Sequence, residues 1–292
     1  SVCPAGAGRW TRGSSQLKKN VKEKTLARAQ VQVERHEAKY IIPPALVPEV
    51  REYIAPFCLP DPNGTGNPPE YTITTIQFDT ADFSLHHAKQ RESLNRFKLR
   101  ARTYGEPGTG KVYLEVKRKF NGVIVKSRAS IPFEAWSEAL IREDRLDLRF
   151  KNRAEEEGFL EFKRLMREVG AEPVLLLRYV RESYFGKIDH YARVTFDRQL
   201  CYLPSNGWTD WGTGREWIAM DTGIVQNQQN RYSGVVLELK TLRDAPQWMI
   251  DAVKRFDLIR CGNCKYSSAV WAESLFSGLP GVPDYAVELL GF

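Results

Sequence analysis

Residues 95–104, NRFKLRARTY, alternate between basic and uncharged side chains. A period of two residues predicts a β-strand with two unlike faces, because successive side chains of a strand point to opposite sides of a sheet. The cationic face would carry Arg96, Lys98, Arg100 and Arg102. These four cations either meet solvent or face an anionic ligand, and the neighbouring segments help to decide between the two.

The same alternation recurs in several other segments, where charged residues take one parity and apolar residues the other. The charged positions are Glu37, Lys39, Glu115, Lys117, Lys119, Lys126, Arg128, Arg193, Glu238 and Lys240. Two of these segments flank Asn121-Gly122, a strong signal for a tight β-hairpin. The cations are therefore predicted to lie on neighbouring strands of one antiparallel sheet.

Strand and helix patterns together predict an α+β fold, an eight-stranded antiparallel β-barrel with helices packed outside. We expect strands at residues 31–42, 71–79, 94–104, 112–120, 123–131, 174–186, 191–197 and 234–241. Residues 204–230 are expected to form a long loop, in which residues 217–220 are a candidate for a further short strand. We expect helices at residues 45–55, 81–90, 133–141, 155–169, 246–259 and 267–276.

Taken one strand at a time, a solvated sheet face explains the charges. Taken together they argue against it, because like charges opposite one another destabilise a sheet. Helices would instead cover the apolar faces, and the cationic faces would line a wet tunnel. Arg and Lys side chains there would bind a chain of phosphates, and a few carboxylates would suit a divalent metal ion.

The composition is that of an ordinary globular protein, with 42% hydrophobic and 27% charged residues and a net charge of +7. The positive balance favours an anionic partner without naming it. No apolar run approaches the ~20 residues of a membrane span, and we expect a cytoplasmic location. Residues 1–30 are basic and predicted to form a mobile arm, and residues 31–292 to form a single domain.

Several residues leave two interpretations open. Cys261-Gly-Asn-Cys264 has CxxC spacing, which arises by chance or serves a redox or metal role. The tryptophans of residues 205–230 could stack a base or pack within their own loop. Asp79 is expected to cap the following helix, and His86 to lie on that helix's surface.

The order and parity of the charged motifs resemble the VTC domain, the polyphosphate polymerase domain within the triphosphate tunnel metalloenzymes of the CYTH superfamily, in its bacterial form. The matching motifs are Glu37-x-Lys39, Phe78-Asp79-Thr80, Lys98-x-Arg100-x-Arg102-x-Tyr104, Leu114-Glu115-x-Lys117, Lys126-x-Arg128, Tyr179-Val-Arg181, Arg193-Val-Thr195-Phe-Asp197, Leu237-Glu238-x-Lys240 and Lys265-Tyr266-Ser267-Ser268. The superfamily often begins with ExExK, and this chain has Arg35 where the first Glu would stand.

The resemblance implies a set of catalytic cations that line the tunnel and hold the phosphates, namely Lys39, Arg100, Arg102, Lys117, Lys126, Arg181, Lys240 and Lys265. Further phosphate-binding residues would be Lys98, Lys119, Arg128 and Arg193. It also implies that Glu238, and after it Glu37 and Glu115, bind Mn²⁺ or Mg²⁺, with the last two acting through water or by orienting lysines.

The predicted function is that of a metal-dependent phosphotransferase that moves the γ-phosphate of ATP onto a growing polyphosphate chain. ATP and inorganic polyphosphate would be its partners, with no nucleic acid, and the resemblance allows for a separate membrane partner. A triphosphatase acting on inorganic, nucleoside or organic triphosphates is the alternative on the same scaffold. A non-catalytic binder of polyphosphate is a third interpretation.

Overall fold

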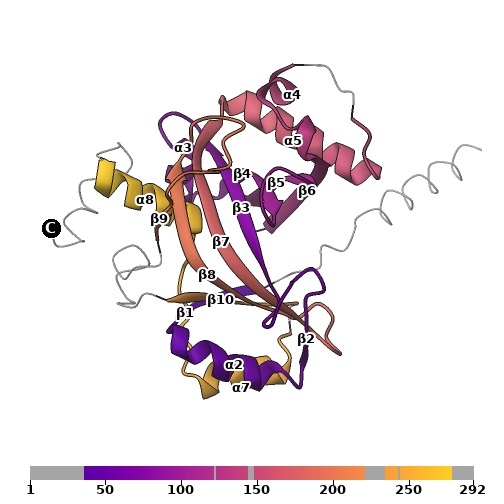
Figure 1. Cartoon of the computed structure of the whole chain (residues 1–292), viewed down its shortest axis with the longest axis vertical. Helices are drawn as coiled ribbons and strands as arrows, with labels where there is room; N and C mark the ends of the chain where they lie inside the picture. Colours follow the sequence, from indigo (N-terminus) through magenta and orange to yellow (C-terminus); the bar gives the residue numbers. More distant parts are fainter. Residues whose placement is uncertain (1–35, 122, 144–147, 221–233, 243, 278–292) are drawn as a thin grey trace, which may run out of the picture.

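The computed structural model describes residues 36–121, 123–143, 148–220, 234–242 and 244–277, and a strongly curled sheet forms its centre (Figure 1). Every strand pair in it is antiparallel. In spatial order the main strands are β1 (His36–Ile42), β10 (Val235–Thr241), β8 (Arg193–Pro204), β7 (Glu172–Gly186), β3 (Glu70–Asp79), β4 (Asn95–Tyr104), β5 (Lys111–Phe120) and β6 (Val123–Pro132).

The predicted set of eight antiparallel strands is confirmed, and they form a half-barrel. The end strands β1 and β6 each pair with one neighbouring strand of the sheet among the described residues. Two short strands are added, β2 (Cys58–Pro60) beside β7 and β9 (Ile218–Ala219) beside β8. The sequence reading missed β2 and ended β8 at residue 197, seven residues early.

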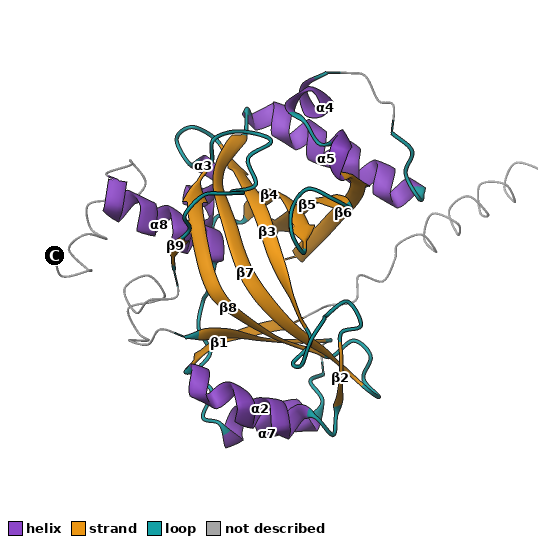
Figure 2. Cartoon of the chain, viewed as in Figure 1, coloured by secondary structure: helices purple, strands orange, loops and turns teal. Residues whose placement is uncertain are grey.

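One pair of helices covers one end of the sheet on its outer side (Figure 2). These are α2 (Val47–Ile54), which follows the short 3-10 helix η1 (Pro44–Leu46), and α7 (Gln247–Arg255). Their buried residues, such as Val50 and Met249, join the apolar face of β1, β8 and β10 in one cluster. Apolar residues of one parity on these strands thus pack under helices, as the alternation predicted.

A second pair of helices covers the other end, α4 (Glu138–Arg142), which follows the 3-10 helix η2 (Phe133–Ala135), and α5 (Arg153–Val169). Asn152 caps α5 by accepting a hydrogen bond from the amide of Glu155 at 3.0 Å. Gly170 ends α5 with φ of 62°, a left-handed conformation that suits glycine. The face of β4 that carries Leu99 and Ala101 packs in the same cluster as α5.

The helix α8 (Lys265–Ser277) departs from the expected arrangement because it packs on the inner face of the sheet. Its residues Tyr266 and Ala269 share a buried cluster with Ile73 and Leu177. Leu177 lies opposite Thr75, which lies opposite Arg102, so this cluster occupies the same face as the predicted phosphate ligands. Part of the inner face is therefore apolar and filled by α8.

Asp79 links α8 to the short helix α3 (Ser84–Gln90). Its carboxylate accepts hydrogen bonds from the amides of Leu85 and His86 and from the hydroxyl of Tyr266, which confirms the predicted capping role. His86 is buried, not exposed as expected, and neither ring nitrogen has a hydrogen-bond partner in the described part of the chain. Burial accordingly lowers the pKa of His86 to about 4.

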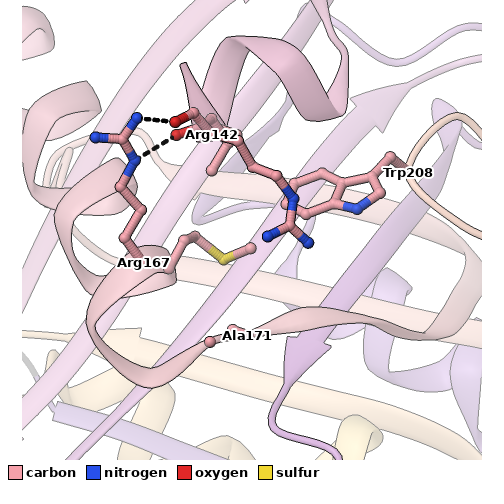
Figure 3. Close-up of a pocket in the computed structure, with 7 residues that line it drawn as sticks. Arg142, Arg167, Ala171 and Trp208 are labelled. Carbon is pink, nitrogen blue, oxygen red and sulfur yellow. Dashed lines mark hydrogen bonds between the residues drawn. The ribbon is translucent and has the colours of Figure 1, made fainter. Parts of the chain in front are cut away.

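The described tryptophans of residues 205–220 serve packing. Trp208 and Trp211 are buried in the outer cluster, and Trp208 lies against Trp136. A pocket beside Trp208 is lined by α4 and the end of α5, where Arg167 donates to the carbonyls of Ile141 and Arg142 (Figure 3). No predicted phosphate-binding residue lines this pocket. Residues 221–230 of the Trp-rich segment and the predicted arm of residues 1–30 lie outside the described residues.

Across the described ranges, no helix is both long and apolar enough to span a membrane.

Phe159 provides a test of the outer helical layer. Its side chain is fully buried on α5 and packs against Phe150, with ring centroids 5.2 Å apart. We expect Phe159→Ala to lower the free energy of unfolding by about 3–5 kcal/mol, because it leaves a cavity in the core. The matched control is Leu160→Ala on the same helix, which is 48% exposed and should cost under about 1 kcal/mol. Equal losses in urea unfolding would contradict this packing.

Candidate phosphate-binding site

The strand register places the predicted cations of β4, β5 and β6 on one face, because residues directly opposite each other share a face of the sheet. Lys98 lies opposite Lys117, which lies opposite Lys126. Arg100 lies opposite Glu115, which lies opposite Arg128. These residues occupy the inner face, on the side away from α5.

The same register extends to the other end of the sheet. The opposed pairs there are Glu37 with Lys240, Lys39 with Glu238, Glu238 with Thr195, Lys240 with Arg193, and Arg181 with Asp197. All the strand residues predicted from sequence for the site therefore share the inner face. Two groups of them make direct contacts, and we call these the arginine cluster and the lysine–carboxylate cluster.

The arginine cluster surrounds Glu115 on β5. Arg100 Nε donates to Glu115 Oε2 at 2.5 Å, Arg102 Nη1 lies 3.8 Å from the same oxygen, and Arg128 Nε lies 3.5 Å from Oε1. Burial alone would raise the pKa of Glu115, but these three guanidinium groups outweigh it and hold the pKa at about 2. Glu115 therefore stays ionised and orients three arginines.

Arg102 has hydrogen-bonding capacity that the protein does not use. Its side chain is only 8% exposed, and its Nε has no hydrogen-bond partner among the described residues. Leaving a buried charged donor unsatisfied is costly. Beside it, Arg128 stacks over the ring of Tyr113, with 4.0 Å between guanidinium carbon and centroid, and donates to Tyr104.

The lysine–carboxylate cluster surrounds Glu238 on β10, whose side chain is 5% exposed. The cations within 4 Å of its carboxylate are Lys240 at 2.6 Å, Lys265 at 3.3 Å, Arg181 at 3.4 Å and Lys39 at 3.5 Å. Burial alone would raise the pKa of Glu238, but the cations, Lys265 foremost, hold it well below its ordinary value. One carboxylate thus gathers four predicted phosphate ligands.

Asp197 is a member of this cluster that the sequence reading did not select. Arg181 donates to both of its oxygens, at 2.6 and 2.7 Å, and Lys265 Nζ lies 2.7 Å away. Asp197 is fully buried, so it fixes the directions of these two cations. In the sequence, Asp197 has the same parity as Arg193 and Thr195, which placed it on the charged face. That pattern does not distinguish an aspartate that orients cations from one that meets solvent.

The two clusters face each other across the curled sheet. The charge of Glu37 on β1 acts on Lys117 of β5, although the two strands are far apart in the sheet order. Tyr179 on β7 joins the clusters from the side, because its phenol interacts electrostatically with both Arg102 and Arg181. The clusters therefore border one shared space on the inner face.

Lys117 has an unusual titration within this space. Burial lowers the pKa of Lys117 to about 8, with Lys126, Lys39 and Lys98 adding to the shift and Glu37 opposing it. Its ammonium group thus titrates close to neutral pH, and a bound anion would favour the charged form.

The other predicted residues lie farther from the two carboxylates. Lys98 donates to the sulfur of Cys264 at 2.7 Å. Lys119 is half-buried, whereas Lys126 and Arg193 are exposed. Arg96 shares the face but is held by Glu92 and by the carbonyl of Ser93.

The carboxylates differ in how well they fit a divalent metal. Mg²⁺ in phosphate sites commonly uses one or two carboxylates together with phosphate oxygens. Glu37 and Glu238 are the two that lie near each other, since both are within 3.5 Å of Lys39 Nζ. Burial alone would raise the pKa of Glu37, but Lys39 foremost holds it at about 2. Glu115 contacts arginines, which favours an orienting role. Among the described residues no group of three or more His, Cys, Asp or Glu side chains is placed to hold a metal.

The match to a protein family agrees with these motifs. The sequence profile of the VTC domain family matches residues 34–272 of the chain. Among solved structures, the chain is similar to a Bacillus halodurans protein provisionally named an adenylate cyclase, with a TM-score of 0.45 and 8% identity, covering 79% of this chain and 94% of that one. No curated protein matches the chain at a significant level.

The arginine cluster predicts a pH-dependent stability. The pKa of Glu115 falls from 4.5 to about 2 in the folded protein, so its contribution is complete above pH 4.5 and is lost as pH falls through 2. We expect Glu115→Gln to lower the free energy of unfolding by about 3 kcal/mol at pH 6, with the difference from wild type shrinking toward pH 2.

Urea unfolding at several pH values measures this difference. Glu157→Gln is the matched control, because Glu157 is 61% exposed and pairs with Arg153 on the surface of α5, and it should change stability by less than about 0.5 kcal/mol. A Glu115→Gln effect that stays constant from pH 6 to pH 2 would contradict the ion pairing described above.

Proposed function

The chain belongs to the VTC domain family, and on that premise we propose that it is a metal-dependent polyphosphate polymerase. It would transfer the γ-phosphate of ATP to the end of a growing inorganic polyphosphate chain. At the coarser level, family and fold together make it a triphosphate-tunnel-type protein that binds nucleotide or phosphate groups.

The observation that carries the proposal is the set of cations that the inner face gathers around two buried carboxylates. Three guanidinium groups surround Glu115, and four cations lie within 4 Å of Glu238. A linear polyanion satisfies donors spread along several strands better than a single small anion does. Arg binds phosphate through paired hydrogen bonds and Lys binds it as a point charge.

Phosphoryl transfer depends on positioning and charge neutralisation more than on covalent participation by the protein. In this proposal, the arginine cluster and the lysine–carboxylate cluster hold neighbouring phosphate groups across the shared space. Glu115 and Asp197 keep the guanidinium groups of Arg100 and Arg181 in fixed directions. The donors are therefore organised before the substrate binds, which reduces the reorganisation needed for the reaction.

Glu37 and Glu238 are the residues proposed to hold Mn²⁺ or Mg²⁺ together with phosphate oxygens. The ion, when bound, would supply further neutralisation of the charge that develops on these oxygens. A phosphate chain is itself an anionic acceptor and needs no strong general base, whereas hydrolysis needs an activated water. The same clusters would bind triphosphate in a hydrolase, so the acceptor has to be identified by experiment.

Incubation of the pure protein with ATP and either Mn²⁺ or Mg²⁺ tests the function directly. We expect ADP and a ladder of polyphosphate chains on a gel, and no product when a chelator removes the metal. ADP with free phosphate alone would assign a triphosphatase instead. No turnover, together with tight tripolyphosphate binding, would assign a non-catalytic binder.

Arg100 and Arg96 form a matched pair for mutation, because both lie on the inner face of β4 but Arg96 is held by Glu92 and Ser93. We expect Arg100→Ala to lower turnover by roughly 100-fold or more, the usual effect of losing one organised donor. Arg96→Ala should retain turnover within about threefold. Circular dichroism checks that both variants fold, and full turnover by Arg100→Ala would rule out the proposed site.

Lys117 predicts the pH dependence of anion binding. Because the pKa of Lys117 is about 8 in the free protein, the ammonium charge is lost as pH rises through 8. We expect the tripolyphosphate affinity of the wild type to fall between pH 7 and pH 9, by at most about tenfold per pH unit. Lys117→Arg keeps the charge and should flatten this dependence in calorimetric titrations, whereas identical pH profiles would contradict a role for Lys117.

A further inference from the structure

The CxxC segment that the proposed function leaves unexplained lies against the phosphate site. Arg260 forms an isolated antiparallel β-bridge with Tyr40 on β1, and the amide of Cys261 donates to the carbonyl of Lys39 at 2.8 Å. Lys39 Nζ in turn donates to the carbonyl of Asn263 at 3.0 Å. The segment therefore runs along the outer edge of β1, beside a predicted phosphate ligand.

The segment also touches two more of these ligands. Cys264 accepts a hydrogen bond from Lys98 Nζ at 2.7 Å. The next residue is Lys265, which begins α8 and contacts Glu238 and Asp197. A change in the covalent state of residues 261–264 would thus act on Lys39, Lys98 and Lys265 together.

Cys264 has the surroundings of a reactive thiolate. It directly precedes α8, its carbonyl accepts from the amide of Ser268 at 2.9 Å, and its sulfur also accepts from Ser267 Oγ at 3.3 Å. Burial alone would raise the pKa of Cys264, but Lys98 and Ser267 outweigh it and lower the pKa to about 6. A lysine and a helix N-terminus are the features that activate cysteines for redox chemistry.

Cys261 is the candidate for the second thiol. Both cysteines are free and half-buried, and two residues separate them in the sequence. Cys58 is buried on β2, and Cys201 on β8 faces the carbonyl of Arg178. The alternative of a metal site lacks further ligands, since the described residues contain no cluster of three metal-binding side chains at this position.

We propose that Cys261 and Cys264 form a reversible dithiol–disulfide pair that regulates the affinity of the phosphate site. The expected effect on phosphate affinity rests on the proposed function, whereas formation of the disulfide does not. The oxidant is a peroxide, and a small dithiol reverses the reaction.

The chemistry has two steps. The thiolate of Cys264 attacks one oxygen of hydrogen peroxide, the O–O bond breaks, and the departing hydroxide takes up a proton to become water. The thiol of Cys261 then attacks the sulfenic sulfur of Cys264, the S–O bond breaks, and the leaving oxygen takes the thiol proton as a second water. Two thiols and one peroxide give one disulfide and two waters.

Oxidation should strengthen anion binding. The disulfide carries no charge, so the site loses one negative charge and Lys98 Nζ loses its thiolate partner. Lys98 then becomes available to a phosphate group on the same face as Lys117 and Arg100. We expect the oxidised protein to bind tripolyphosphate roughly threefold to tenfold more tightly, an effect of the size expected for one charge in a partly screened site.

The test uses the full chain, reduced or treated with hydrogen peroxide. Trypsin cleaves after Arg260 and Lys265 and releases both cysteines in one peptide, CGNCK. Mass spectrometry should show this peptide lighter by two hydrogens after oxidation. Calorimetry with tripolyphosphate should show the tighter binding, and dithiothreitol should reverse both changes.

Two variants separate charge from cross-linking. Cys264→Ser removes the thiolate without forming a disulfide, and in the reduced state it should bind tripolyphosphate as tightly as the oxidised wild type. Cys261→Ser keeps the thiolate and should bind like the reduced wild type.

The outcomes distinguish the two proposals. Absence of the disulfide in CGNCK, or a disulfide that leaves the affinity unchanged, would overturn the redox inference while the proposed function stands. Failure of the reduced wild type to bind tripolyphosphate would instead overturn the proposed function and the regulation that rests on it. The peptide mass would still decide whether the dithiol reacts.

Discussion

The buried carboxylates of the inner face are the constraint on which the rest of the structure depends. Lys98, Lys117 and Lys126 stand opposite one another on three successive strands, an arrangement that destabilises a sheet. Within this row Glu37 acts on Lys117 and Cys264 accepts a hydrogen bond from Lys98. On the same face Glu115 and Glu238 each stay ionised among three or more other cations. Removing such a carboxylate would leave buried charges without partners, at a cost of several kcal/mol. The anionic side chains therefore allow a face this cationic to exist before any ligand binds.

The helices complete this arrangement by enclosing the opposite face. The pair α2 and α7 and the pair α4 and α5 bury apolar residues of alternate parity on the strands, so the charged parity is left for the interior of the half-barrel. Helix α8 packs on the inner side. It fills the part of that face that lacks charges and brings Lys265 to Glu238 and Asp197. Its N-terminus thus adds a cation to a cluster otherwise built from strands.

Alternation within single strands was sufficient to predict which side chains share the inner face, because that property is local. It could not predict which cations would share a carboxylate, since the pairing of Arg100 with Glu115 depends on strand register and that of Arg181 with Asp197 on the position of β8 beside β7. The position of α8 was also beyond local patterns. An apolar helix face indicates burial but not which side of the sheet buries it. A local pattern likewise does not show what packs over a single histidine, so the burial of His86 was missed.

The partners that a cation already has within the protein, more than its charge, distinguish candidate phosphate ligands from structural cations on this face. Arg96 and Arg100 have the same parity on the same strand, but the guanidinium group of Arg96 donates to Glu92 and to the carbonyl of Ser93. Arg102 retains a buried Nε without a partner in the described structure, whereas Lys39 and Lys265 each contact a second carboxylate besides Glu238, namely Glu37 and Asp197. In the proposed function, an anion would bind beside these residues while they keep their carboxylate contacts. Ligand binding would then add to the ion-pair network instead of replacing it, and the same carboxylates would hold the donors in place around the bound anion.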